Sequence, residues 1–353
     1  MKQIISVLLI TFSMLGGCAD QNQGKDNVSV FLSLFSDKTA RDSQTDRSKF
    51  SLATFTGVTY YVDAVHGKDA NSGTSPSLPF KTITKAAFSA RNGDVILVAA
   101  GTYNAALGEI FPISIAPGVT IFGDESTKGG SWGYYTGSGS SPNVGSTLIE
   151  GGGNLIPSPF SPAVILASNS VIGGFVITNP MSDSMASGII LYYANNATVR
   201  NNTVTNGNNG ATGIYVHQSG SNAISNNIIR NNSIGIYQEE STSFNLVENN
   251  WIRNNDSGIL LFDLKLDLGG GPTGSLGRNW IFCNTIRDLF IDEGSLLVPE
   301  LFAKNNNWDH NPPTIDSFSS GGGIDIFNHD GVTNVLTENS ALIAPSLCVP
   351  NQK

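Results

Sequence analysis

A repeat of about 22 to 28 residues, with one longer insertion, constrains the fold of this chain more than any other feature of its sequence. Glycine followed by isoleucine recurs at spacings of 25, 22 and 23 residues, and apolar residues five positions apart recur in the same order. A fixed period of this length is typical of solenoids, in which each coil contacts only its neighbours. The Gly-Ile pairs begin at Gly188, Gly213, Gly235 and Gly258, and the apolar pairs are Ile172/Ile177, Val199/Val204, Ile224/Ile229, Val247/Ile252 and Ile281/Ile286.

The content of each repeat indicates β structure. Short runs that alternate apolar and polar residues, such as residues 223–225 and 235–238, are separated by Asn-Asn and Gly turns. The regular leucines of leucine-rich repeats and the long 3.6-residue periodicity of helical repeats are both missing from the sequence. We therefore predict an all-β fold, a single-stranded right-handed parallel β-helix of about ten coils with strands about 4.8 Å apart.

The composition agrees with many turns and few helices. The chain holds 36 Asn, 39 Gly and 15 Pro, while charged residues make up 13%, about half of the usual ~25%. Coiled coils and helix bundles need many more Glu, Lys, Arg and Ala, so the composition argues against them. The net charge of −9 argues against a general phosphate-neutralising surface, and we expect no nucleic-acid partner.

Four asparagines share one position in successive coils, two residues before a predicted inward apolar residue. Stacked amides can hydrogen-bond to one another and to the backbone of a corner, which offsets the cost of burying a turn. We therefore predict an asparagine ladder with a scaffold role, formed by Asn202, Asn227, Asn250 and Asn284.

The N-terminal part of the repeat region carries several motifs of bacterial β-helix proteins. They are Tyr60-Tyr61-Val62-Asp63, residues 67–74, residues 79–87, residues 93–98, residues 101–103, residues 119–123 and residues 174–178. Through these motifs the chain resembles pectate-lyase-like proteins and, more closely, the family called domain of unknown function 1565, over about residues 60 to 330.

Residues 79–87 suit a short amphipathic helix with Ile83, Ala86 and Ala87 inward. The resemblance implies that this helix caps the open end of the solenoid, which would otherwise expose unpaired strand edges. No activity comes with the resemblance, because the family has no established function.

The N-terminal residues have the pattern of an export signal. Met1 to Gln3 precede an apolar run from Ile4 to Leu15 that is too short to span a membrane. Residues 15–18, Leu-Gly-Gly-Cys, resemble the bacterial lipobox, which implies that Cys18 is diacylated and anchors the mature protein. An ordinary signal peptide with an incidental cysteine is the alternative. Ala19 in place of an aspartate favours the outer membrane, and the sequence leaves open which face the protein occupies.

Four segments follow from these features. We expect a lipoprotein signal peptide at residues 1–17, a lipidated polar tether at 18–57, the β-helix at 58–340 and a C-terminal tail at 341–353. After lipidation, Cys283 and Cys348 remain. In an oxidising compartment they can pair and attach the tail to a late coil. Two free thiols, with Cys283 buried, are an equal alternative.

Catalytic motifs are scarce. A hydrolase on this scaffold needs two carboxylates facing one cleft. Galacturonan hydrolases also carry an Asp-Asp pair and a Gly-His-Gly motif, and this chain has neither. A polysaccharide lyase needs a basic residue, and Lys265 stands between Asp263 and Asp267 in the longest insertion. We favour a solvated charged loop over a lyase site for these three residues.

Calcium is the one cofactor that the sequence leaves open. Asp63, Asp69 and Asn71 cluster near the start of the solenoid and offer oxygen ligands. Turn formation by Asp, Asn and Gly explains the cluster equally well, so we expect no cofactor.

The repeat register predicts an aromatic row on the outer surface. The second and fourth residues after each repeat glycine point outward, because side chains alternate along a strand. Four rings and two polar groups align in this way, namely Tyr192, Tyr215, Tyr237 and Phe262 with His217 and Glu239, and Glu240 follows at the fifth position. Flat rings beside hydrogen-bonding groups suit an extended saccharide. Ring stacking that only stabilises the sheet is the alternative that we favour.

Arg230, Arg253 and Arg287 also share one register. Such a stripe can contact an anionic polymer, but neutralisation by nearby acids is the interpretation that we favour. The candidate acids are Glu248, Asp256 and Asp288.

These features predict an exported, lipid-anchored β-helix that acts as a binding or structural module at the cell envelope, with carbohydrate as the expected ligand class. A carbohydrate-active enzyme, a lyase or a glycoside hydrolase, is the second hypothesis. A surface adhesin without a small ligand is the third. The sequence does not specify the oligomeric state.

Overall fold

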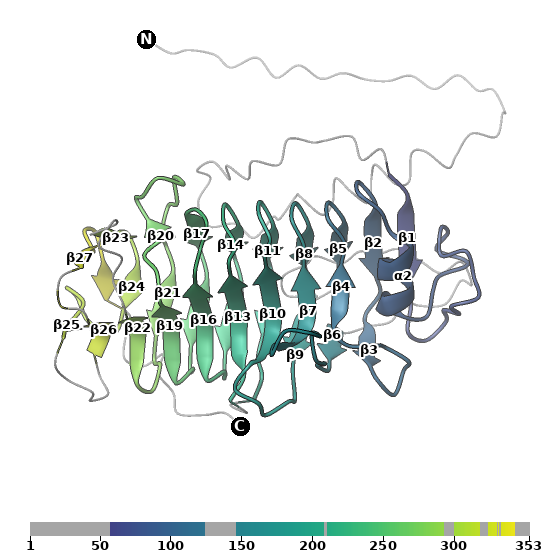
Figure 1. Cartoon of the computed structure of the whole chain (residues 1–353), viewed down its shortest axis with the longest axis horizontal. Coiled ribbons are helices and arrows are strands. Elements are labelled where there is room, and N and C mark those ends of the chain that lie inside the picture. Colours follow the sequence, from purple (N-terminus) through teal and green to yellow (C-terminus); the bar gives the residue numbers. More distant parts are fainter. Residues whose placement is uncertain are drawn as a thin grey trace, which may run out of the picture.

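The computed structural model describes residues 57–123, 146–207, 210–292, 300–317, 324–329, 331 and 333–342. The chain winds into a right-handed parallel β-helix whose coils lie side by side along the long axis of the molecule (Figure 1). Every strand pairing is parallel, and each coil contributes strands to three sheets, named A, B and C here. The all-β solenoid predicted from the repeat is confirmed.

Within the described residues, sheet A has ten strands and sheets B and C have nine each. The strands of sheet A are β1 (Thr59–Val62), β2 (Val95–Val98), β5 (Thr120–Phe122), β8 (Val171–Gly173), β11 (Thr198–Arg200), β14 (Ala223–Ser225), β17 (Asn245–Glu248), β20 (Leu266–Gly269), β23 (Glu300–Ala303) and β27 (Asn334–Leu336). Nine strands form sheet B. They are β3 (Gly101–Asn104), β6 (Thr147–Glu150), β9 (Val176–Thr178), β12 (Thr203–Val204), β15 (Ile228–Arg230), β18 (Trp251–Arg253), β21 (Trp280–Phe282), β24 (Asn307–Trp308) and β28 (Ala341–Leu342).

Nine strands form sheet C, which carries the Gly-Ile repeat. They are β4 (Ile113–Ile115), β7 (Ser161–Leu166), β10 (Ala186–Tyr192), β13 (Thr212–His217), β16 (Ile234–Glu239), β19 (Ser257–Leu261), β22 (Arg287–Ile291), β25 (Ile315–Asp316) and β26 (Ile324–Asn328). The isoleucines of the repeat pair with one another from coil to coil and are fully buried. They are Ile189, Ile214, Ile236 and Ile259. Burying each such side chain stabilises the fold by about 1.5–3 kcal/mol.

The glycine of each repeat is required by close packing between coils. A Cβ atom at Gly235 would lie 2.4 Å from the carbonyl oxygen of Gly258 on the next coil. A Cβ at Gly213 would meet the carbonyl oxygen of Gly235 at 2.5 Å in the same way. A side chain at this position therefore forces neighbouring coils apart.

The two residues of each Asn-Asn dipeptide have different structural roles. The first asparagine adopts a left-handed conformation, with φ of 55° at Asn201 and 57° at Asn226, which asparagine tolerates better than most residues. The second is fully or almost fully buried and extends a ladder. Asn202 donates its side-chain amide to Asn227 at 3.2 Å, and Asn227 donates to Asn250 at 3.0 Å. At these corners the same dipeptide turns the chain and supplies the ladder hydrogen bond.

The predicted fourth member of this ladder was wrong. Asn250 continues to Asn279 rather than to Asn284, with an amide–oxygen distance of 3.1 Å. Asn284 instead accepts from Asn255 in a second ladder, which runs through the next corner of each coil. The error arose from Ile281 and Ile286. Ile281 is the inward residue that follows Asn279, whereas Ile286 is 39% exposed, so the assumed register was displaced by one corner.

The helix α2 (Ile83–Ser89) lies at the N-terminal end of the solenoid, beside β1 and β2 (Figure 1). Ile83, Ala86 and Ala87 are buried, as the amphipathic pattern predicts. The Glu109 carboxylate accepts from the backbone N–H groups of Ile83 and Thr84 at 2.6 and 2.8 Å. The helix thus caps the first coil and has its own first turn satisfied.

The predicted signal peptide, Cys18, the tether as far as residue 56 and Cys348 lie outside the described residues. Cys283 is disulfide-bonded. Among the residues that the structure describes, no helix is long and apolar enough to cross a membrane.

Candidate functional site

The outward face of sheet C carries rings and polar groups on adjacent coils. Tyr192, His217 and Glu239 occupy one register position on β10, β13 and β16, and Tyr215 pairs with Tyr237 two positions earlier in each strand. We call these five residues the sheet C cluster. Neighbouring strands of one sheet lie about 4.8 Å apart, so their side chains are in direct contact.

Glu239 is the centre of the cluster. Its Oε1 accepts from the Tyr215 hydroxyl at 2.5 Å, and its Oε2 accepts from the Tyr237 hydroxyl at 2.9 Å. His217 places Nδ1 2.7 Å from the same Oε1, so Nδ1 is the donor and the imidazole is held in one orientation. The side chains of His217 and Glu239 are 13% and 23% exposed. The cluster is therefore rigid and still reaches solvent.

The two tyrosines of the cluster remain neutral donors. Burial raises the pKa of the Tyr215 hydroxyl, and its hydrogen bond to Glu239 raises it further. Burial also raises the pKa of Tyr237, with the Glu239 charge as the next cause. Because each tyrosine stays protonated, both can donate to the single carboxylate at once.

The continuous aromatic row predicted from the register was wrong at Tyr215. The ring of Phe160, just before β7, packs edge-on against it with centroids 5.0 Å apart, and Tyr215 is only 4% exposed. Tyr192 stacks on His217 at 5.4 Å with an interplanar angle of 11°. Phe262 is 38% exposed and packs edge-on against Tyr237. Exposed rings therefore border a buried centre.

Tyr193 was missed by the sequence reasoning. It is 54% exposed and packs edge-on against Tyr192 at 4.5 Å. Its φ of 51° turns the chain at the end of β10, so it falls outside the strand alternation. The Tyr-Tyr pair was the available signal. Glu240 holds the equivalent turn after β16, with a φ of 52°, and accepts from the Gln218 amide.

Residues 65–315 match the model of the family described as "Protein of unknown function (DUF1565)", which covers well over half of the chain. The chain belongs to this family.

No curated protein matches the sequence of this DUF1565 chain. Among solved structures it is similar to pectate lyase Pel9A, with 14% identity, 80% of this chain and 79% of that chain covered, and a TM-score of 0.46. It is also similar to pectin methylesterase PemA from Erwinia chrysanthemi, with 15% identity, 80% and 78% covered, and a TM-score of 0.35. A complex of iota-carrageenase with iota-carrageenan fragments aligns at 12% identity over 81% and 60%, with a TM-score of 0.36.

The three lyase candidates of the DUF1565 chain, Asp263, Lys265 and Asp267, all form hydrogen bonds with the protein backbone. Asp267 is fully buried and accepts from the backbone N–H groups of Gly269, Gly271 and Thr273 at 2.9–3.0 Å. Asp263 accepts from the Ser241 N–H at 2.7 Å, and Lys265 donates to the Ser241 carbonyl at 2.7 Å. A buried Asp267 is inaccessible to a polymer, so the three residues do not form an open catalytic site.

The calcium candidates near the N-terminus are also engaged by protein donors. Asp63 is 2% exposed and accepts from the N–H groups of Val65 and His66 at 2.8 and 3.1 Å. Asp69 accepts from the N–H of Thr82 at 2.9 Å. The Asp63 contacts are those of a turn-forming residue, whereas Asp69 joins its loop to the residue that precedes α2.

Sheet B presents a second exposed surface. Trp251 and Trp280 stack with centroids 5.0 Å apart and an interplanar angle of 10°, and Trp251 is 40% exposed. Arg230 pairs directly with Arg253 beside them. Within the described part of the chain, neither arginine forms an ion pair with an acidic residue, so the predicted neutralisation was wrong for these two.

Arg287 does not belong to the same stripe. It lies on sheet C, where its guanidinium sits 4.0 Å from the ring centroid of Phe290. The predicted acids are used elsewhere. Glu248 accepts from the Leu276 N–H at 2.9 Å, and Asp256 accepts from the Thr285 hydroxyl at 3.1 Å.

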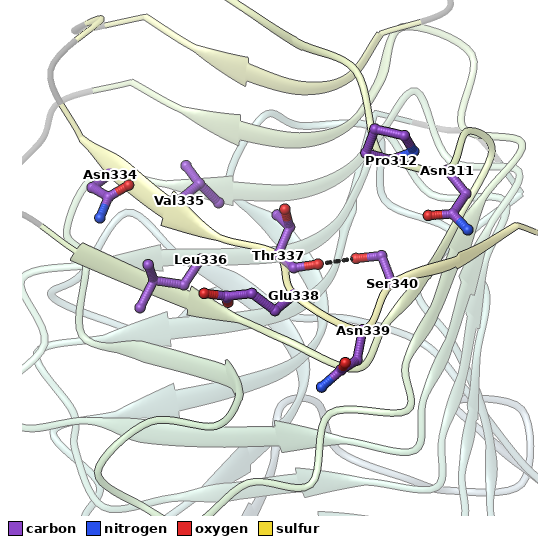
Figure 2. A pocket seen from close by; sticks show the side chains of 9 residues that line it. All are labelled: Asn311, Pro312, Asn334, Val335, Leu336, Thr337, Glu338, Asn339 and Ser340. Carbon is purple, nitrogen blue, oxygen red and sulfur yellow. Dashed lines mark hydrogen bonds between the residues drawn. The ribbon is translucent and has the colours of Figure 1, made fainter.

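A hollow of about 450 Å³ lies at the C-terminal end of this DUF1565 protein, and Figure 2 shows the side chains that line it. It lies between Asn311–Pro312 and the segment from Asn334 to Ser340. Of the described residues that line it, Glu338 alone is charged, and its carboxylate pairs with Lys304 at 3.3 Å. The hollow therefore lacks a pair of free acid and base groups.

Proposed function

We propose that this DUF1565 protein binds a carbohydrate at the cell envelope through the sheet C cluster and the exposed rings beside it. The observation that carries the proposal is the contact of Glu239 with both tyrosine hydroxyls and with His217. Saccharide sites combine flat apolar rings with a few polar groups that are held in place before the ligand arrives. The rigid centre supplies such polar groups, and Tyr193 and Phe262 supply rings with exposed surface.

The direction of the site follows from the coils. Tyr192, His217 and Glu239 lie along the axis of the solenoid, one per coil, and the exposed Phe262 follows β19 on the next coil. A ligand that contacts all of them must be extended rather than a single sugar ring. We therefore place an oligosaccharide or polysaccharide along the axis.

Glycan binding is tested with the full mature chain on a glycan array. We expect the wild type to bind at least one saccharide class, and we expect Tyr193→Ala with Phe262→Ala to weaken binding by about tenfold or more. Trp251→Ala is the matched control, since it removes an aromatic ring of similar exposure from sheet B. No binding by the wild type, or equal losses in both variants, would contradict the proposal.

Anchoring through Cys18 is the second part of the proposal. The lipobox-like residues 15–18 support it, and the disulfide at Cys283 suits an oxidising compartment outside the cytoplasm. We expect Cys18→Ser to lose labelled palmitate and to leave the outer-membrane fraction. Unchanged membrane association in that variant would contradict the anchor. Protease shaving of intact cells then distinguishes the surface from the periplasmic face.

A carbohydrate-active enzyme is the second candidate function, and the contact between His217 and Glu239 favours it. A carboxylate that orients an imidazole through Nδ1 leaves Nε2 as the nitrogen that can exchange a proton with a substrate. The test is a panel of uronic-acid polymers, in which lyase action produces ultraviolet-absorbing unsaturated ends. A wild-type signal that His217→Gln abolishes would favour the enzyme, and a silent panel would rule out the lyase form.

A further inference from the structure

Three aspartates meet at the C-terminal end of the solenoid, far along the chain from the sheet C cluster. Asp288 lies on β22, Asp325 lies on β26, and Asp309 follows β24 at the corner between sheets B and C. Each contributes a carboxylate oxygen to a group whose members all lie within 4.8 Å of one another. These strands lie at the green and yellow end of the molecule (Figure 1).

Two of these aspartates replace a glycine of the repeat. Gly258 lies beside Asp288, and Asp288 lies beside Asp325, as the flanking residue pairs of β19, β22 and β26 show. The four coils before Asp288 have glycine here, at Gly188, Gly213, Gly235 and Gly258, where an added Cβ would lie 2.4–3.0 Å from the next carbonyl oxygen. Strands β22 and β26 thus place an acidic side chain where these four coils have none.

Protein groups donate a hydrogen bond to at least one oxygen of each of the three carboxylates. Asn284 donates to Oδ1 of Asp288 at 2.7 Å, and the Cys283 N–H donates to Oδ2 of Asp309 at 2.9 Å. Oδ2 of Asp325 accepts from the hydroxyl of Thr314 at 2.8 Å. In contrast, Oδ2 of Asp288 has no hydrogen-bond partner among the described residues, and Asp288 is only 2% exposed. A buried, unpaired carboxylate oxygen is costly unless a proton or a cation meets it.

Positive charge from the protein is scarce at this corner. The described residues offer one ionisable partner for Asp325, the half-exposed His310, whose Nδ1 is 3.0 Å from Oδ2. No lysine or arginine in the described ranges pairs with Asp288 or Asp325. Oδ2 of Asp288 is therefore the atom of the group that a bound cation would satisfy.

The spacing fits an ion that prefers oxygen ligands. Two oxygens bound to one Ca²⁺ at about 2.4 Å can lie at most about 4.8 Å apart. The carboxylate oxygens of this group all lie within 4.8 Å of one another. Carboxylates are the ligands that hard divalent cations select, and Ca²⁺ accepts irregular geometry more readily than Mg²⁺.

We infer that Asp288, Asp309 and Asp325 bind one Ca²⁺ ion, which closes the C-terminal end of the second asparagine ladder. In earlier coils the ladder amide donates to the next asparagine, as Asn255 does to Asn284 at 3.0 Å. The amide of Asn284 donates to Asp288 instead, so the ladder ends at the acidic group. The ion takes the place of the next amide and holds the last coils to the solenoid.

Calcium chloride titrated into the chelator-treated full chain tests this inference. Isothermal calorimetry is expected to give one site per chain, and the melting temperature is expected to rise by about 2 °C or more at saturation. Asp288→Asn keeps the shape of the side chain and removes a ligand charge, so it is expected to abolish both effects. Asp309→Asn is the second variant, to be used if Asp288→Asn does not fold, because Asp309 is only partly buried.

Asp292→Asn is the matched control, since Asp292 directly follows β22 and faces His329 rather than the aspartate group. It is expected to bind Ca²⁺ as the wild type does. The inference is overturned if the wild type shows neither binding nor a thermal shift, or if Asp309→Asn and Asp288→Asn bind Ca²⁺ unchanged. It does not depend on the proposed function, because glycan binding by the sheet C cluster has its own readout.

Discussion

The side-chain amide of Asn227 donates to the side-chain oxygen of Asn250 on the next coil at 3.0 Å, and Oδ1 of Asn227 accepts from the backbone N–H of Asn202 on the coil before. One buried amide therefore joins three successive coils. Because a solenoid contacts itself only between neighbours, such a residue contributes to two interfaces at once.

Replacing Asn227 by alanine is expected to lower the free energy of unfolding by about 3 kcal/mol or more, since it removes several buried hydrogen bonds at once. These include the bonds to the backbone N–H of Asn202 and to the carbonyl of Val199. Denaturant unfolding followed by circular dichroism measures the loss. Asn334→Ala, on an exposed part of β27, is the control and is expected to change little. Equal stability of the two variants would refute the ladder's scaffold role.

Gly235→Ala is expected to destabilise the solenoid by about 1–3 kcal/mol, because the new Cβ would lie 2.4 Å from the carbonyl oxygen of Gly258. Thermal unfolding measures the change. Gly274→Asn is the control. Its φ of 77° is one that asparagine tolerates, and no atom lies within 4 Å of the added Cβ. A stable Gly235→Ala protein would show that the coils can separate without cost.

Tyr215 and Tyr237 are expected to resist ionisation at alkaline pH, because burial and Glu239 raise the pKa of both hydroxyls. The unfolded chain releases these protons near the ordinary tyrosine pKa of about 10. Above that pH the folded state holds more protons than the unfolded state, so the free energy of unfolding falls as the pH rises.

Glu239→Gln removes the negative charge next to both hydroxyls. We expect phenolate absorbance to appear at lower pH in this variant than in the wild type. Spectrophotometric titration measures the shift, and Glu248→Gln on sheet A is the control. An identical titration for the wild type and Glu239→Gln would mean that burial alone protects these tyrosines.

Arg253→Met is expected to stabilise the protein by up to about 1 kcal/mol at low ionic strength, because it relieves the repulsion from Arg230 on the neighbouring strand. The Nε of Arg253 is buried without a partner among the described residues, and burial followed by the Arg230 charge lowers the pKa of Arg253. Salt screens this repulsion, so the gain is expected to shrink as ionic strength rises. Melting curves at two salt concentrations measure it, with Lys68→Met as an exposed control.

The repeat could be predicted from the sequence because each coil is held by contacts that recur at the same place. The inward isoleucines, the Gly-Ile junctions and most of the ladder asparagines all follow from one local period. The same logic aligned Tyr192, His217 and Glu239 correctly, as the pairing of β10, β13 and β16 shows. It failed at Asn284, because the turns between strands differ in length and the five-residue spacing occurs at more than one corner of a coil.

Sequence by itself therefore determined the solenoid, the residues that face inward and the scaffold role of asparagine, since these depend on periodic local contacts. Only the tertiary structure decided what covers each face. Phe160 buries Tyr215 from the loop before β7, and Asp309 meets Asp288 and Asp325 across a corner. Neither contact follows the period, because each depends on where an irregular loop packs and not on the spacing of residues along the coil.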